Sequence, residues 1–270
     1  MHECSAQSTQ LYMDELQLEE LEEISNEALA IVEAEFGSGY PFANAEPKQG
    51  LPYHNRRHSV AVRDGAGRMA AALGLSQAGV AISRTSGSIH DLVQLKDRGV
   101  MERESAEWMA ATLEARGIFP SWAAEVGSLA CEGTEPILED GVVVGQMVSH
   151  QEYPSKEAEE VAMSVASADL GELYAPHGPL TSRDYFLELT KTPAGVTPPV
   201  DERLIGFQQK QVQLTQDFRY PHPMGEYLFG GLRGEVVNYN TQVLGQLQRG
   251  EIETWDDLLA QDYAFALAHS

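Results

Sequence analysis

The chain has 270 residues, with 18 basic against 41 acidic side chains, and a formal net charge of −23 at neutral pH. A field this negative repels phosphate backbones and anionic lipid, which argues against binding of nucleic-acid polymers or membrane surfaces. With 43% hydrophobic residues, the composition is that of a globular protein that can bury a sizeable core.

The cysteine content and the N-terminal segment indicate the cellular compartment in which we expect the protein. The two cysteines, Cys4 and Cys131, are too few for a disulfide framework and favour a reducing environment. The first residues lack the basic start and apolar run of a secretory signal, and no apolar stretch approaches the roughly 20 residues that cross a bilayer. We therefore expect a soluble, cytoplasmic protein.

Helical periodicity dominates the first half of the chain. Apolar residues recur at helical spacing over residues 11–36 while glutamates occupy the other faces, which predicts an amphipathic N-terminal helix. Residues 37–52 carry glycine and proline without periodicity and predict a loop. Further helices are predicted over residues 55–73, 76–90, 102–116, 121–131 and 155–173.

The second half adds one short β segment and more helices. Residues 141–148 are rich in valine and flanked by glycine, which predicts a strand or hairpin. Residues 176–199 hold five prolines and predict a loop, broken by one helical turn at 185–189. Three more helices are predicted over residues 201–218, 225–247 and 254–268. The predicted fold class is therefore all-α, and we expect a single domain over residues 1–270.

Histidines and aspartates stand out in three of the predicted helices. His54 and His58 are four positions apart, so they share one face if the helix has begun. The pair His90 and Asp91 follows near the end of an apolar helix, and Asp169 lies in a helix built otherwise of alanine, valine and leucine. Buried imidazoles and carboxylates need partners, and one divalent cation satisfies several at once. The pattern thus predicts a metal site suited to hydrolysis.

The same spacing resembles the signature of the HD-domain metal-dependent phosphohydrolases: a histidine, a His-Asp pair some thirty residues later, and a distant aspartate. The matching metal ligands are His58, His90, Asp91 and Asp169. The resemblance covers residues 53–173, less than half of the chain. It implies an all-α HD core at about 53–175, preceded by an N-terminal helix and followed by a C-terminal helical extension at about 200–270.

Two subgroups of that family supply further matches. Tyr53-His54-Asn55 looks like the corresponding segment of cyclic-nucleotide phosphodiesterases, which implies that His54 is the general acid that protonates the leaving oxygen. Other HD phosphohydrolases carry an Asn-Glu-x-x-Ser-Ala segment after His-Asp. Residues 101–106 match it at Glu102, Ser105 and Ala106 but begin with methionine, and the resemblance implies a supporting role for Glu102.

Differences from the motifs of known HD subgroups narrow the range of activities expected for this chain. The residues after Asp91 lack the acidic side chains of bacterial 5′-nucleotidases and guanosine-tetraphosphate hydrolases, and the Gly-Tyr-Pro motif of cyclic-dinucleotide phosphodiesterases is absent. Family members that bind two metal ions have additional histidine ligands. The candidate for such a ligand in this chain is His150, and Glu132 and Glu135 are possible carboxylate ligands in place of further histidines. One divalent ion, of Mn, Zn, Fe, Co or Mg, is therefore expected.

Substrate binding is assigned to residues near the motifs. In so acidic a chain, basic side chains close to a metal could hold a phosphate, although each is more often an ordinary ion-pairing residue. The candidates are Asn55, Arg57, Arg84 and Lys96, with Arg56 as a further nearby cation.

The sequence thus predicts a metal-dependent phosphohydrolase that acts on a small phosphorylated molecule, with a nucleotide phosphomonoester or phosphodiester as the leading candidate. His54 and Asp91 are its predicted catalytic residues. One alternative keeps the fold but makes the protein an HD-type di-iron oxygenase, which needs about six protein ligands. The other is a non-catalytic, metal-binding regulatory protein that uses the acidic helix at 19–35 against a basic partner.

Overall fold

A computed structural model describes residues 11–37, 51–94, 100–193 and 195–270 of the protein. Within these ranges the chain forms eleven α-helices, one short 3-10 helix and a single two-stranded hairpin, which confirms the all-α prediction. None of the helices in these ranges combines the length and apolar character of a membrane-crossing segment.

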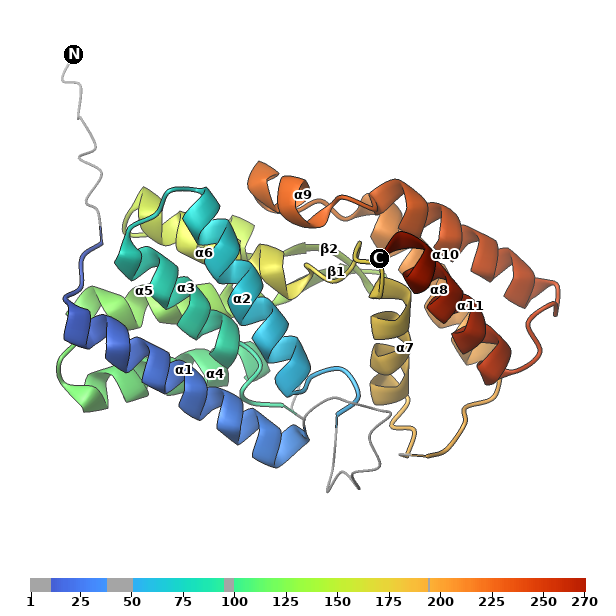
Figure 1. The fold of residues 1–270 in the computed structure, drawn as a ribbon, viewed down its shortest axis with the longest axis horizontal. Helices are drawn as coiled ribbons and strands as arrows, with labels where there is room; N and C mark the ends of the chain where they lie inside the picture. The colour runs from blue at the N-terminus through green and yellow to red at the C-terminus, as the bar shows by residue number, and fades with distance from the viewer. Residues whose placement is uncertain (1–10, 38–50, 95–99, 194) are drawn as a thin grey trace, which may run out of the picture.

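Six helices pack together at one end of the molecule (Figure 1). The main hydrophobic core lies between them, built largely of alanine, valine, leucine and isoleucine side chains. They are α1 (Glu15–Phe36), α2 (Arg56–Ala72), α3 (Gln77–Ile89), α4 (Val100–Arg116), α5 (Ser121–Glu132) and α6 (Lys156–Asp169).

The N-terminal helix α1 forms as its sequence pattern predicts. Asp14 caps it in a capping box with Gln17, which satisfies amides that the first turn would otherwise leave unpaired. Leu21, Ile24 and Ala28 are buried against the core, while most of the glutamates face solvent. Burial of this apolar stripe is what attaches α1 to the bundle.

Helices α2, α3 and α6 lie side by side because small residues stand where their backbones meet. A Cβ at Gly87 of α3 would come within 2.9 Å of the Cα of Arg63 in α2. A Cβ at Gly65 of α2 would lie 3.1 Å from the Cβ of Ala168 in α6. This close packing brings together the start of α2 and the ends of α3 and α6.

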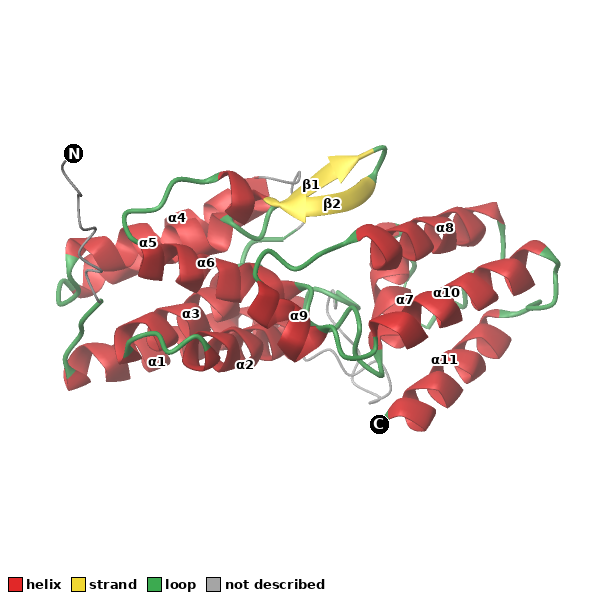
Figure 2. Cartoon of the chain, turned by 90° about the horizontal axis from the view of Figure 1, so that it is seen from above, coloured by secondary structure: helices red, strands yellow, loops and turns green. Residues whose placement is uncertain are grey.

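The predicted β segment is a hairpin of β1 (Pro136–Glu139) and β2 (Val142–Gln146), followed by the 3-10 helix η1 (Met147–His150). Asp140 and Gly141 make its tight turn, both with positive φ, as the right-handed twist of the two strands requires. The hairpin extends from the six-helix group toward the C-terminal helices, where β2 contacts α8 (Glu202–Asp217) (Figure 2).

Two predicted segments differ from the structure. The proline-rich stretch contains a full helix, α7 (Gly178–Leu189), in place of one helical turn. Pro179 stands in its first turn, where a proline removes no hydrogen bond and its fixed φ suits the helix. The helix predicted over 225–247 is two helices, α9 (Pro223–Phe229) and α10 (Arg233–Gln248), because the chain breaks at Gly230 and Gly231.

The last helix, α11 (Trp255–His269), joins α7, α8 and α10 around a second, smaller core that includes Phe186, Leu204 and Trp255. A buried polar network ties this group together. The guanidinium of Arg183 in α7 donates 2.8 Å and 3.3 Å hydrogen bonds to the carboxylate of Asp262 in α11, and it also donates to Gln208 of α8. Because each buried partner is paired, the network fixes α7 against the C-terminal helices.

Candidate metal centre

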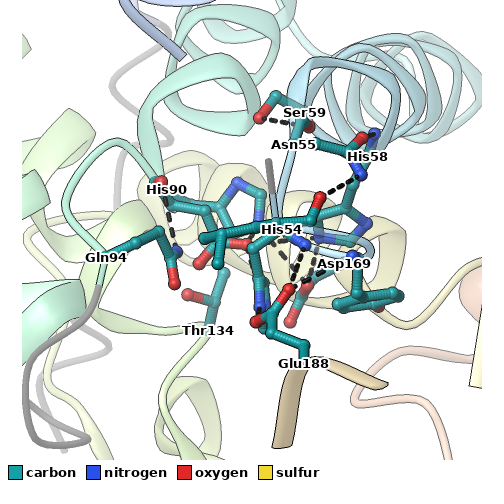
Figure 3. Close-up of polar contacts among 12 residues, drawn as sticks. His54, Asn55, His58, Ser59, His90, Gln94, Thr134, Asp169 and Glu188 are labelled. Carbon is teal, nitrogen blue, oxygen red and sulfur yellow. Dashed lines mark hydrogen bonds and ion pairs between the residues drawn. The ribbon is translucent and has the colours of Figure 1, made fainter. Parts of the chain in front are cut away.

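Four metal-ligand side chains converge where three helices of the main bundle begin or end. His58 lies in the first turn of α2, His90 and Asp91 follow the last turn of α3, and Asp169 is the last residue of α6. One ligand atom from each residue lies within 4.8 Å of every other, as predicted for a shared metal ion. Figure 3 shows the imidazoles of His58 and His90 and the carboxylate of Asp169 at this meeting point.

Asn55 sets the position of His58. The Asn55 side-chain oxygen accepts hydrogen bonds from the amides of Arg57 and His58 at 3.0 Å and 3.3 Å, so it starts the helix one turn before the histidine. The Asn55 amide nitrogen donates to the carbonyls of Leu51 and Pro52. The side chain is fully buried and both its ends are engaged within the chain.

The ligand atoms are separated by distances that suit a common cation. His90 Nε2 lies 2.9 Å from Asp91 Oδ2 and 3.4 Å from Asp169 Oδ1. His58 Nε2 lies 3.3 Å from each of the same two oxygens. Donor atoms that are each about 2.1 Å from one metal ion stand about 3.0–3.4 Å apart when they are neighbours in octahedral or tetrahedral coordination, so these four separations are compatible with a shared ion.

Several of these buried atoms lack hydrogen-bond partners. His58 Nε2, His90 Nε2 and Asp91 Oδ2 make no well-oriented hydrogen bond within the described residues, despite their short separations. A buried polar atom without a partner is costly, and a cation would satisfy all three together. His90 Nδ1 donates to the carbonyl of Gly87 at 2.9 Å, which leaves the lone pair of Nε2 for a metal.

The charges of the site also favour a cation. Burial lowers the pKa of His58, but the close carboxylates of Asp169 and Asp91 outweigh burial and raise it to about 9. The pKa of His90 is likewise raised by the two carboxylates against the effect of burial. For Asp91 and Asp169, burial alone would raise the pKa, yet the neighbouring histidines lower it. The two largely buried carboxylates therefore stay ionised and favour positive charge beside them.

His54 stands at the edge of this cluster. Its Nε2 lies 3.9 Å from Asp91 Oδ2, while its Nδ1 pairs closely with Oε1 of Glu188 on α7 (Figure 3). The other oxygen of Glu188 accepts hydrogen bonds from the amides of Tyr53 and His54, at 3.1 Å and 3.0 Å. Although burial raises the pKa of Glu188, these hydrogen bonds lower it, so the carboxylate is ionised and orients the His54 ring.

Sequence reasoning missed Glu188. It lies in the segment predicted as a loop, and nothing in its spacing relates it to His54. The one sequence feature that includes Glu188 is the short helical pattern at 185–189. This pattern predicted a helical turn, but it could not predict which face of the bundle the helix would cover.

The predicted substrate residues lie in different places. Arg57 pairs with Asp184 of α7 at 3.3 Å. Arg84 pairs with Glu22 and Asp64, each at 3.6 Å, and lines a surface groove between α1 and α3, so it is not brought to the metal cluster. Arg56 pairs with Glu33 at 3.2 Å, and Lys96 lies outside the described residues.

The additional ligand candidates do not join the four-residue cluster within the described part of the chain. His150 is exposed at the end of η1, and Glu132 and Glu135 are partly exposed near the hairpin. Glu102 is buried and lines a cavity of about 150 Å³ that opens beside Asp91 and Asp169.

Comparison with protein-family models, with curated proteins and with solved structures finds no match for this chain. The described residues establish a helical protein with a buried cluster of two histidines and two aspartates that could hold a metal ion.

Proposed function

We propose that this protein is a metal-dependent phosphohydrolase of the HD type, which cleaves a phosphomonoester or phosphodiester in a small molecule such as a nucleotide. The observation that carries the proposal is the convergence of His58, His90, Asp91 and Asp169, whose unpartnered buried atoms meet beside a cavity. That donor set suits a divalent ion of Mn, Zn, Fe, Co or Mg.

A divalent cation held there would lower the pKa of water toward neutrality and offset charge on a phosphoryl oxygen. The chain's own residues supply the remaining steps. Asp91 lies between the histidine pair and His54, so its carboxylate can orient the attacking water as well as hold the ion. As the bond from water to phosphorus forms, the water releases one proton to solvent, the ester bond breaks, and His54 Nε2 gives its proton to the departing oxygen.

Glu188 supports this role of His54 because it holds the imidazole ring in one orientation. It holds Nδ1 of the imidazole while the two backbone amides hold the carboxylate itself, so the ring can turn only with the loss of its hydrogen bond to a fixed carboxylate. With Nδ1 directed at Glu188, Nε2 faces the metal cluster and the cavity. A general acid needs such fixed placement next to the leaving group.

The test is metal analysis of protein purified without chelator, followed by a phosphoester screen over nucleotides and cyclic nucleotides. We expect about one divalent ion per chain, phosphate or phosphomonoester release, and loss of both in Asp91→Ala. Asp64→Asn is the matched control, because Asp64 is a half-exposed acid on α2 that pairs with Arg63 away from the cluster. Full activity in Asp91→Ala would refute the proposed mechanism.

The same experiment separates the two alternatives. Two irons per chain with consumption of dioxygen would indicate a di-iron oxygenase, although the four-residue cluster falls short of the six or so ligands expected of one. A bound ion with no turnover of any phosphoester would indicate a regulatory metal protein.

A further inference from the structure

Gln146 reaches the candidate metal centre from the β-hairpin. It is the last residue of β2 and is 3% exposed, and its amide nitrogen donates a 3.3 Å hydrogen bond to Oδ2 of Asp169. An ionised carboxylate can only accept, so the amide group must turn its nitrogen toward Asp169. The hairpin thus contacts one of the four clustered residues directly.

The two oxygens of Asp169 face different partners. Oδ1 lies 3.3 Å from Nε2 of His58 and 3.4 Å from Nε2 of His90, so it faces the atoms that would share a cation. Oδ2 is the oxygen that Gln146 holds. These contacts fix the rotation of the carboxylate, which presents a single oxygen to the ion site.

The amide of Gln146 orients Asp169 without adding charge. A lysine or arginine in the same place would pair with the carboxylate and compete with a cation. A neutral donor leaves the negative charges of Asp91 and Asp169 for the ion, so the residue type suits a support for a metal ligand.

The backbone around Gln146 is held in place. The amides of Met147 and Val148, which follow it, donate to the carbonyls of Glu135 and Gly133 at 2.8 Å and 3.0 Å. These bonds tie the end of β2 to the segment that leaves α5, and η1 also contacts α5 and α6. The glutamine is therefore delivered from a fixed point.

A β-bulge brings Gln146 to the correct face of the hairpin. Val144 has no residue opposite it in the strand register. Val143 and Gln146 are three positions apart, so in a regular strand they would point to opposite faces. Both line the cavity beside the cluster, because the extra residue changes the alternation between them.

From these contacts we infer that Gln146 is a positioning residue for the metal ligand Asp169, and that the hairpin is the element that supplies it. This inference rests on the proposed function and extends it: the glutamine acts on the bound ion only through the carboxylate that it orients.

Metal affinity tests the inference without catalysis. Gln146→Met removes the donor but keeps the length of the side chain, and Gln146→Leu is a second variant without the donor. With the full chain freed of metal, the Kd for Zn²⁺ is measured by competition with a chelating dye. We expect the Kd to rise by about ten- to a hundredfold in both variants. The matched control is Gln211→Met, because Gln211 is a buried glutamine in the same cavity wall that bonds to Ser182, and its Kd should be unchanged.

A double-mutant cycle shows whether the effect passes through Asp169. Asp169→Ala leaves three ligands, which can still hold zinc. In that background Gln146→Met should change the Kd by less than about twofold. An equal loss of affinity with and without Asp169 would overturn the inference, because the glutamine would then act by another route.

The visible spectrum of the Co²⁺-loaded chain reports ligand geometry. We expect Gln146→Met to change the position and intensity of its absorption bands, since Oδ2 of Asp169 is then free to turn toward the ion, whereas Gln211→Met leaves them unchanged. A spectrum of Gln146→Met equal to that of the unmodified protein would contradict the inference.

These measurements separate the inference from the proposed function. If the unmodified chain cleaves phosphoesters and Gln146→Met binds Zn²⁺ equally well, the inference is wrong and the function stands. If the unmodified chain binds Zn²⁺ but no phosphoester is cleaved with any metal, the function is wrong and the Kd values still decide the role of Gln146. If the unmodified chain binds no ion, both are wrong.

Discussion

His54 and Glu188 are 134 positions apart in the chain, yet Nδ1 of the histidine pairs directly with Oε1 of the glutamate. The second oxygen of Glu188 holds the amides of Tyr53 and His54, so a single carboxylate fixes both the backbone and the ring next to the metal cluster. This contact joins the C-terminal group of helices to the segment that precedes α2.

Replacing Glu188 with glutamine should lower kcat by about ten- to a hundredfold with little change in KM. A glutamine has one acceptor oxygen, so either the ring or the backbone amides lose their partner. The loss should be larger for alkyl esters than for 4-nitrophenyl esters, whose leaving group needs no proton. Leu189→Ala, at an exposed position on the same helix, is the control. Equal losses for both kinds of ester would argue against a role in proton donation.

Removal of the metal should destabilise the fold. A ligand that binds only the folded chain adds about 2.7 kcal/mol at a hundred times its Kd. We therefore expect Mn²⁺ or Zn²⁺ added to chelator-treated protein to raise Tm by several degrees, as measured by calorimetry. Asp169→Asn should abolish most of this rise, whereas Asp64→Asn should retain it. An equal rise in both variants would show that the ions bind elsewhere.

Gly87 should not tolerate a side chain. Its replacement by alanine places a Cβ 2.9 Å from the backbone of α2, which cannot yield as a flexible side chain would. We expect a loss of about 1–3 kcal/mol in the free energy of unfolding, measured with urea. Gly206→Ala in α8 is the matched helical control, because nothing lies within 4 Å of the new methyl, and it should stabilise by about 0.5–1 kcal/mol.

Asp184 should make stability depend on pH. Burial raises the pKa of its carboxyl to about 7, with Arg57 opposing the rise and Glu172 and Glu188 adding to it. Between its unfolded value of 3.8 and about 7, the folded chain holds a proton that the unfolded chain has lost. Its contribution to stability is therefore full at low pH and falls as pH rises through that window.

The Asp184→Asn variant removes this dependence. We compare the free energies of unfolding of the variant and the unmodified protein, measured by denaturant titration at each pH. The difference between them should change by more than about 1 kcal/mol in favour of the variant from pH 4 to pH 8. A difference that stays constant with pH would mean that Asp184 is ionised throughout.

Local patterns predicted most of the helices and the metal cluster. The cluster could be inferred because the His90-Asp91 pair and Asp169 stand in otherwise apolar helical segments, and because their spacing, together with His58, resembles the HD signature. The N-terminal cap at Asn55 was likewise visible as a helix start.

What could not be predicted depends on contacts between distant segments. Arg84 was placed near the site from its position in the sequence, but Glu22 and Asp64 hold its guanidinium between α1 and α2. Glu188 and Gln146 acquire their roles only after α7 and the hairpin dock, and no short-range pattern encodes that docking. The prolines of the 176–199 segment were interpreted as breaking structure, whereas Pro179 occupies the one turn of a helix that accepts it.

The buried ion pair of Arg183 and Asp262 links the last helix of the chain to α7, the helix that carries Glu188. Two and five positions after Arg183, the same helix carries Tyr185, which lines the cavity, and Glu188, which pairs with His54, while Asp262 belongs to the final helix. A substitution that displaces the last helix is therefore expected to displace α7 as well, and with it the carboxylate that orients His54. A change near the C-terminus can thus affect the candidate metal centre without contacting any of its four residues.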